Sequence, residues 1–314
     1  MKIRTRSIIF MILIAFVILP VLLILLLYVN HLYSLGNIKR NTDIGLQFLK
    51  KNNCSIYIIA HNLFELNVNS GDWHERPLSC YAKNKTDATI SNGLVYFYDN
   101  GAIRIASTNS ENVSRILVDQ CFRASNFAVS KDNKKLAYQD YLDDMFQKSA
   151  IMVFDLEAET KSKVFEFSGV ADSISWACSD NNHLFFSKSG KIKKLDLTNG
   201  QSKTIAEGYW VKAVSENTLV YWRNDGKYSA CYKKDFVTNS EKELFRTKEP
   251  LKGVDWDPTG RFVVASIPTY TGKFFNFWHH TTTPFVWDTY TQKQYRLPYC
   301  DYYSGCIFWK NIKN

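Results

Sequence analysis

The feature that most constrains this fold is a unit of short strands that recurs along most of the chain. Beyond residue 53, runs rich in Val, Ile, Tyr, Phe and Trp alternate with clusters of Gly, Asn, Asp and Ser, as in strands joined by tight turns. Each unit has a short buried strand, a stronger apolar strand, a third strand that often ends in Asp, and a fourth strand. Aromatic residues make up 15% of the sequence, which also favours a β protein.

The units begin at fairly regular intervals of 37 to 53 residues. A repeat of four strands every ~40–45 residues is typical of the blades of a β-propeller. We therefore predict an all-β propeller domain over residues 54–314. The predicted starts of the units are Asp87, Ser125, Asp172, Tyr209, Lys252 and, for a truncated unit, Gly305.

The two ends of this region are each incomplete and complement one another. Residues 305–309 resemble an innermost strand with no blade after it, whereas residues 54–78 contain three strands and no first strand. Joining the two segments completes one blade, and closing the ring removes exposed sheet edges. Five internal blades and one closing blade predict a six-bladed propeller, with seven blades as the alternative.

Three segments resemble the WD40-like propeller repeats of the TolB type, whose motif approximates W-S-P-D-G-K-x-(L/I)-A-F. The best copy is Trp256–Ala265, which reads WDPTGRFVVA. Val129–Tyr138 lacks the Trp and the Pro, and Ile174–Phe186 is a degenerate copy. The resemblance covers residues 54–314 and implies a propeller of the kind also found in prolyl oligopeptidase and dipeptidyl-peptidases.

The amino-terminal segment predicts a membrane anchor. Residues 8–29 form an uncharged run of 22 residues, and a helix of that length spans roughly 33 Å, enough to cross a hydrocarbon core. A cleaved signal peptide would have a shorter apolar run and small residues at its cleavage site, and a buried core helix would show a polar stripe. Neither pattern is present, so we predict a transmembrane helix over 8–29.

The charges that flank this run predict its orientation. Residues 1–7 carry Lys2, Arg4 and Arg6, whereas the first basic residues after the run are Lys39 and Arg40. The positive-inside rule keeps residues 1–7 in the cytoplasm as a basic tail and places the propeller outside. Residues 30–53 are predicted to be a linker with a short, weak helix at 43–51. In a bacterium, this single-pass protein would face the periplasm from the inner membrane.

Composition and motifs argue against several classes of function. Beyond residues 1–7 the basic residues exceed the acidic ones by a modest and dispersed +6, and no nucleic-acid-binding module is recognisable, so we predict no nucleic acid partner. The sequence contains no G-x-S-x-G elbow, phosphate loop, dinucleotide fingerprint or H-E-x-x-H motif. We predict no catalytic residues, no metal site and no cofactor. The seven cysteines are either buried thiols or partly paired.

Two hairpins are longer than the usual two to five residues and mark a candidate binding face. They are residues 139–149 in the third blade and 269–283 in the sixth, which face each other across the channel of a six-bladed ring. Aromatic residues dominate interface hot spots, although the sixth-blade aromatics also suit a cluster folded back onto the propeller. The candidate partner-binding residues are Tyr141, Asp143, Asp144, Met145, Phe274, Phe275, Phe277, Trp278, His279 and His280.

These expectations lead to two functional hypotheses. The preferred one is a membrane-anchored, non-enzymatic protein-binding or scaffold module, acting in the cell envelope or neutralising a toxin as an immunity-type protein. The alternative is a propeller enzyme, a hydrolase or lyase acting on glycans or peptides through a carboxylate or histidine on the channel face.

Overall fold

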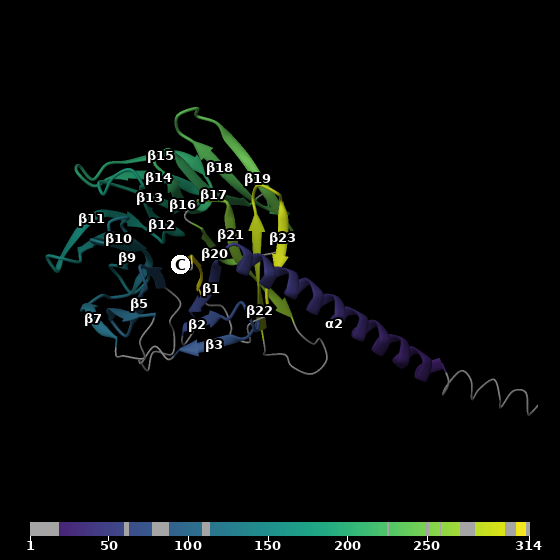
Figure 1. Cartoon of the computed structure of the whole chain (residues 1–314). Coiled ribbons are helices and arrows are strands. Elements are labelled where there is room, and N and C mark those ends of the chain that lie inside the picture. The colour runs from purple at the N-terminus through teal and green to yellow at the C-terminus, as the bar shows by residue number, and fades with distance from the viewer. Residues whose placement is uncertain are drawn as a thin grey trace, which may run out of the picture.

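The computed structural model describes residues 19–59, 63–76, 88–108, 114–224, 226–248, 251–257, 259–270, 280–298 and 306–311. In this part of the chain, one long helix precedes six four-stranded antiparallel sheets, which are arranged as blades in a ring (Figure 1). The six-bladed propeller predicted from the repeats is confirmed, and the seven-bladed alternative is wrong. Each predicted unit start lies within one residue of an innermost strand, for example Asp87 beside β4.

Each blade runs from an innermost strand at the channel to an outermost strand at the rim. Blade 1 has β24 (Cys306–Asn311), β1 (Cys54–Ile59), β2 (Leu63–Leu66) and β3 (Trp73–Arg76); blade 2 has β4 (Ala88–Ser91), β5 (Leu94–Asp99), β6 (Ala102–Ser107) and β7 (Arg115–Val118). Blade 3 has β8 (Ala124–Val129), β9 (Lys135–Tyr141), β10 (Lys148–Asp155) and β11 (Thr160–Ser168); blade 4 has β12 (Ser173–Trp176), β13 (His183–Lys188), β14 (Lys191–Asp196) and β15 (Ser202–Glu207). Blade 5 has β16 (Tyr209–Ser215), β17 (Thr218–Asn224), β18 (Ser229–Asp235) and β19 (Glu241–Thr247); blade 6 has β20 (Lys252–Trp256), β21 (Phe262–Tyr270), β22 (His280–Asp288) and β23 (Lys293–Arg296).

Closure of the ring by the two ends of the propeller is also confirmed. Strand β24 pairs with β1 along its whole length, from Cys54 opposite Asn311 to Ile59 opposite Cys306. The side chains of Ile307 and Trp309 are buried against blade 6 and help to form the core between blades 6 and 1. The other pairs of neighbouring blades each bury an apolar cluster of their own.

The Asp that often ends the third strand of a unit has a local structural role. In blades 3 to 6, its Oδ1 accepts a hydrogen bond from the backbone N–H two residues later, at 2.8–3.0 Å. The residue four positions after each Asp then has a positive φ between 51° and 69°. This is the geometry of an Asx turn, which the short acidic side chain favours. The four residues are Asp155, Asp196, Asp235 and Asp288.

The helix α2 (Leu19–Lys51) differs from the predicted linker at 30–53, because it continues without interruption to Lys51. No proline interrupts residues 30–51, and the end of the helix gains packing against the propeller. Leu49 is buried in the core between blades 6 and 1, and Phe48 stacks on Tyr295 with ring centroids 4.0 Å apart. The helix therefore covers the seam between blades 6 and 1.

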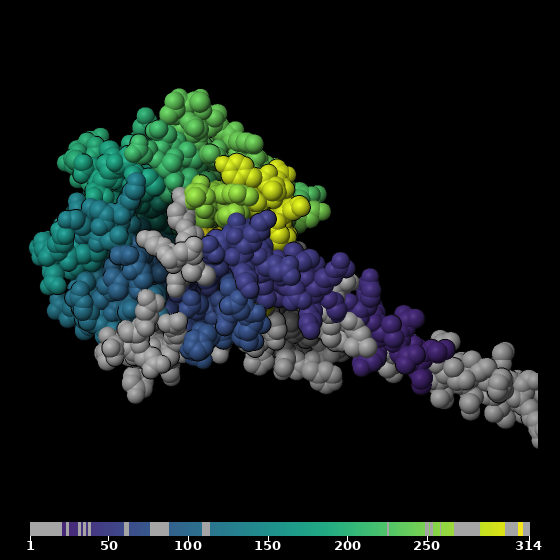
Figure 2. All heavy atoms as spheres, viewed as in Figure 1, coloured from purple at the N-terminus to yellow at the C-terminus, as the bar shows by residue number. Residues whose placement is uncertain are grey.

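The first half of α2 projects away from the propeller (Figure 2). Several of its apolar side chains are more than half exposed, among them Leu26 and Tyr33. Within the residues that the structure describes, no helix is both long and apolar enough to cross a membrane. The predicted tail at 1–7 and half of the predicted span at 8–29 lie outside those residues, so the anchor stays a prediction.

Candidate binding surface

The third-blade hairpin places one predicted residue in a supporting role. Strands β9 and β10 reach Tyr141 and Lys148, so the connecting turn is shorter than predicted, at residues 142–147. Tyr141 is only 8% exposed, and its ring is nearly perpendicular to the ring of Phe146, with the centroids 4.8 Å apart. The guanidinium of Arg123 lies over both rings, at 5.8 and 5.0 Å. Tyr141 therefore supports the hairpin from below and is not an exposed anchor.

The two predicted acidic residues have different environments. Asp143 holds the turn, because its Oδ1 accepts a hydrogen bond from Gln147 N at 2.8 Å and its carbonyl accepts one from Phe146 N at 3.3 Å. Phe146 has a φ of +56°, which is uncommon for a bulky residue and is maintained by this turn. Asp144 is exposed to solvent.

Exposed apolar side chains surround this turn. Met145 is 76% exposed, as expected for a contact residue. The connections on either side of the turn carry further apolar side chains, and they are held to it by hydrogen bonds from Tyr141 N to Arg123 O at 3.3 Å and from Gly169 N to Gln147 O at 2.8 Å. We call this surface the blade-3 patch. It consists of Phe122, Leu142, Met145, Phe146 and Val170, all 37–76% exposed.

Three of these five residues lie in the hairpin predicted at 139–149, where Met145 was a predicted contact residue and Leu142 and Phe146 were not, whereas Phe122 and Val170 lie outside it. Phe122 and Val170 belong to the connections between blades, which are remote in sequence from the hairpin. In an antiparallel four-stranded blade, those connections emerge at the same end as the hairpin between the second and third strands. The propeller topology predicted from the repeats therefore places Phe122 and Val170 at the same end of the blades as the hairpin.

The sixth-blade hairpin is more regular at its base than predicted. Strands β21 and β22 pair out to Tyr270 opposite His280, so residues 269–270 and 280–283 are strand and not loop. His280 is the first residue of β22. The other five predicted partner-binding residues of this hairpin, Phe274, Phe275, Phe277, Trp278 and His279, lie outside the described residues.

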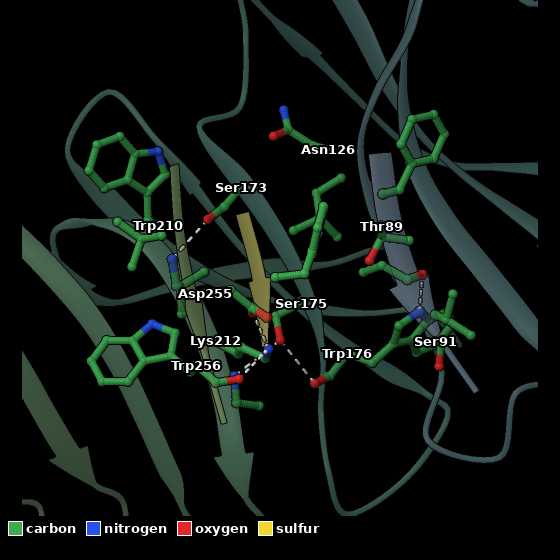
Figure 3. Close-up of a pocket in the computed structure, with 18 of the residues that line it drawn as sticks. Thr89, Ser91, Asn126, Ser173, Ser175, Trp176, Trp210, Lys212, Asp255 and Trp256 are labelled. Carbon is green, nitrogen blue, oxygen red and sulfur yellow. Dashed lines mark hydrogen bonds and ion pairs between the residues drawn. The ribbon is translucent and has the colours of Figure 1, made fainter. Parts of the chain in front are cut away.

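A cavity of about 430 Å³ occupies the central channel and is lined by the innermost strands of all six blades. Its wall combines hydroxyl and amide groups with aromatic rings (Figure 3). Lys212 forms an ion pair with Asp255 and also donates a hydrogen bond to Trp256 O at 3.0 Å. Asp255 in turn accepts a hydrogen bond from Trp309 N at 3.0 Å, so this ion pair links blades 5, 6 and 1.

Asp172 and Trp256 both line the channel and each have a buried polar atom that lacks a hydrogen-bond partner among the described residues. In Asp172 this atom is Oδ2, and burial raises the pKa of the Asp172 carboxyl. Nearby, Asn126 donates to Ala171 O at 2.8 Å and to Gln139 Oε1 at 3.2 Å. Among the described residues, no group of three or more His, Cys, Asp and Glu side chains is placed to hold a metal ion.

Among the described residues, Cys121, Cys178 and Cys231 are free thiols. The thiol of Cys54 donates a hydrogen bond to Asn52 O at 2.9 Å. Burial is the main cause that raises the pKa of Cys54 to about 12 and the pKa of Cys121 to about 11. Because the thiolate is the reactive form, these two side chains are poor nucleophiles. They contribute to apolar clusters between the blades.

Comparison with known proteins identifies the fold and leaves the family open. No protein-family model matches the chain, and no curated protein sequence matches it. Among solved structures, it is similar to TolB from Acinetobacter baumannii, with a TM-score of 0.60 and 13% identity over 82% of this chain and 66% of that one. A putative TolB from Agrobacterium tumefaciens gives 0.59 and 12% over 81% and 91%. An oligogalacturonate lyase in complex with manganese gives 0.52 and 11% over 77% and 78%.

Proposed function

We propose that this chain is a non-enzymatic binding module that recognises a protein partner through the blade-3 patch. The observation that carries the proposal is the exposure of five neighbouring apolar side chains on a framework fixed by hydrogen bonds. Monomeric proteins rarely leave contiguous apolar surface bare unless it binds something. Met and aromatic residues are also enriched at protein interfaces.

The proposal includes the membrane anchor and the extracytoplasmic location. Its support is the apolar run at 8–29, the basic residues before it and the bare apolar side chains on the projecting half of α2. In a bacterium the propeller would face the periplasm, where the partner is an envelope protein or a toxin to be neutralised. A reporter that works only outside the cytoplasm, fused after Asn314, tests this location, and a soluble, shortened mature protein would contradict it.

The binding site is tested with a matched pair of double substitutions. The double substitution Phe122→Ala and Met145→Ala removes two exposed side chains of the patch. The double substitution Val237→Ala and Tyr290→Ala removes two side chains that are at least as exposed, at turns between third and fourth strands. Those turns lie at the opposite end of the blades. We expect both proteins to melt like the wild type, because exposed side chains contribute little to stability.

Only the first pair should weaken binding of the partner, by about 2 kcal/mol or more, as hot-spot truncations do. The partner is first trapped with a photo-crosslinking residue at position 145, with position 237 as the control. A single adduct from position 145, together with weaker binding of that same partner to the first pair, supports the proposal. Equal adducts from both positions, or binding unchanged by the first pair, would refute it.

The enzymatic alternative rests on Asp172, whose unpartnered carboxyl oxygen lines the channel. A carboxyl with a raised pKa can act as a general acid. Asp172→Asn should abolish any hydrolase or lyase activity on glycans or peptides and leave partner binding intact. Partner binding that depends on the patch, in a protein without such activity, favours the binding module.

A further inference from the structure

A second cleft lies where α2 meets the outer parts of blades 6 and 1. It has a volume of about 330 Å³, and three elements line it: α2, the turn before β3, and the end of β23. It lies on the outside of the propeller, since β3 and β23 are the outermost strands of their blades. Its lining includes Lys39, Thr42, Asp72, Trp73, Arg296 and Pro298.

The charge of this cleft is unbalanced. Lys39 and Arg296 contribute two positive charges, whereas Asp72 contributes one negative charge and is exposed to solvent. Arg296 is partly buried and forms no ion pair with any residue in the described ranges; burial lowers the pKa of its guanidinium. Several other arginines on the blades form ion pairs, such as Arg223 with Glu241 at 2.9 Å and Arg261 with Asp288 at 2.9 Å.

Packing holds Arg296 in place. Its backbone pairs with Phe285 in the sheet, and the guanidinium lies 6.0 Å from the centre of the Phe285 ring. On the other side, α2 comes so close that a Cβ on Gly45 would lie 2.0 Å from the carbonyl oxygen of Arg296. Burying a cation without a counter-charge is unfavourable, so the fold retains a partly buried guanidinium, on a backbone held by these contacts, that an anion would stabilise.

We propose that this cleft binds a phosphate-bearing anion between Arg296 and Lys39. The guanidinium presents paired N–H donors that suit phosphate oxygens, and the lysine adds a mobile positive charge. The hydroxyl of Thr42 adds a polar group, while the indole of Trp73 donates its N–H to Pro298 O at 3.3 Å and leaves its ring as an apolar wall.

Two sources share this chemistry: a phospholipid headgroup and a free phosphate compound. Lys39 follows Val29, the end of the apolar run, by ten residues, which is about 15 Å along a helix. The cleft therefore lies on the side of the propeller from which α2 would enter a bilayer, and the length of α2 between Val29 and Lys39 exceeds one headgroup layer of about 5–8 Å. The lipid source rests on the proposed membrane anchor, whereas binding of free phosphate does not.

The test uses the full chain in nonionic detergent and in nanodiscs. Inorganic phosphate is titrated by calorimetry in detergent, and retention of phosphatidylglycerol is measured by native mass spectrometry after release from nanodiscs. The variants are Arg296→Gln and Lys39→Gln. The controls are Arg115→Gln on β7, an exposed arginine, and Lys50→Gln on α2 outside the cleft. Unfolding curves of every variant show whether Arg296→Gln folds, and the exposed Lys39 carries the test if it does not.

Phosphate binding that falls about tenfold or more in Arg296→Gln and several-fold in Lys39→Gln, with unchanged controls, would support a free phosphate ligand. Lipid retention with the same dependence, without phosphate binding, would support the headgroup. The proposal is overturned if the wild type binds neither, or if the variants and controls behave alike. Loss of partner binding through the blade-3 patch would leave all of these results unchanged, so the two proposals fail separately.

Discussion

The packing of α2 on the propeller predicts an unusual result for a glycine-to-alanine substitution in a helix. Gly45 lies in the part of α2 that covers the seam between blades 6 and 1. A Cβ at this position would lie 2.0 Å from the oxygen and 3.0 Å from the carbon of the Arg296 carbonyl, and 3.2 Å from Leu297 Cδ2. Two of these three atoms belong to the backbone of blade 6, so the clash can be relieved only by moving the helix.

The same helix provides its own control. At Gly36 an added Cβ would meet no atom within 4 Å. Alanine is the better helix former by about 0.8–1.0 kcal/mol, so Gly36→Ala should stabilise the protein by at most about 1 kcal/mol. At Gly45 the same gain is offset by overpacking, which costs about 1–3 kcal/mol. Displacement of the helix would also expose Leu49, whose burial is worth about 1.5–3 kcal/mol.

We therefore expect Gly45→Ala to lower the free energy of unfolding by about 2 kcal/mol and Gly36→Ala to raise it slightly or leave it unchanged. Both variants are measured as full chains in nonionic detergent by urea unfolding, followed by tryptophan fluorescence. Hydrogen exchange at residues 45–51 reports whether the end of the helix has detached. Equal stabilisation by the two substitutions would show that α2 does not pack closely on blade 6.

Two further predictions concern the closing blade and the channel. Removal of residues 306–314 deletes β24 and the buried side chains of Ile307 and Trp309. Loss of each of these side chains costs about 2–5 kcal/mol of stability, so the truncated chain should aggregate or be degraded. An unchanged melting curve would contradict ring closure. Burial raises the pKa of the Asp172 carboxyl above its ordinary 3.8, so the charged form destabilises the fold. Asp172→Asn should therefore stabilise the protein at neutral pH, with a gain that disappears towards pH 3.8, and urea unfolding across this range checks both the gain and its sign.

The blade architecture could be predicted because each blade repeats the same local chemistry. In the best copy of the repeat motif, the carboxylate of Asp257 accepts hydrogen bonds from the backbone N–H groups of Thr259 and Phe262, which fixes the turn between the first and second strands. Gly260 follows in the left-handed region, with a φ of +69°. The Asp and Gly that this turn requires are close together in the sequence, so a short-range sequence pattern was enough to locate the blades.

Contacts between distant segments were not predictable in this way. The continuation of α2 to Lys51 depends on the packing of Leu49 and Phe48 against the seam between blades 6 and 1. The strands of blade 6 lie about 200 residues or more after the helix in the sequence. The blade-3 patch likewise combines Phe122, Met145 and Val170 from three separate connections. The length of the hairpin predicted the part of this surface that contains Met145. The parts that contain Phe122 and Val170 follow only from the topology of the ring.

The positions of the helix and the patch on the ring bear on how a partner could reach an anchored propeller. Helix α2 packs at the seam between blades 6 and 1, whereas the patch lies on blade 3, which faces blade 6 across the six-membered ring. A partner bound at the patch would therefore lie on the far side of the channel from the helix. If α2 leads to a bilayer, that arrangement leaves the patch accessible, and a bulky tag at position 237 or 290 should not block it. A tag at position 145 should abolish binding, and equal effects at all three positions would show that the partner does not approach from the blade-3 side.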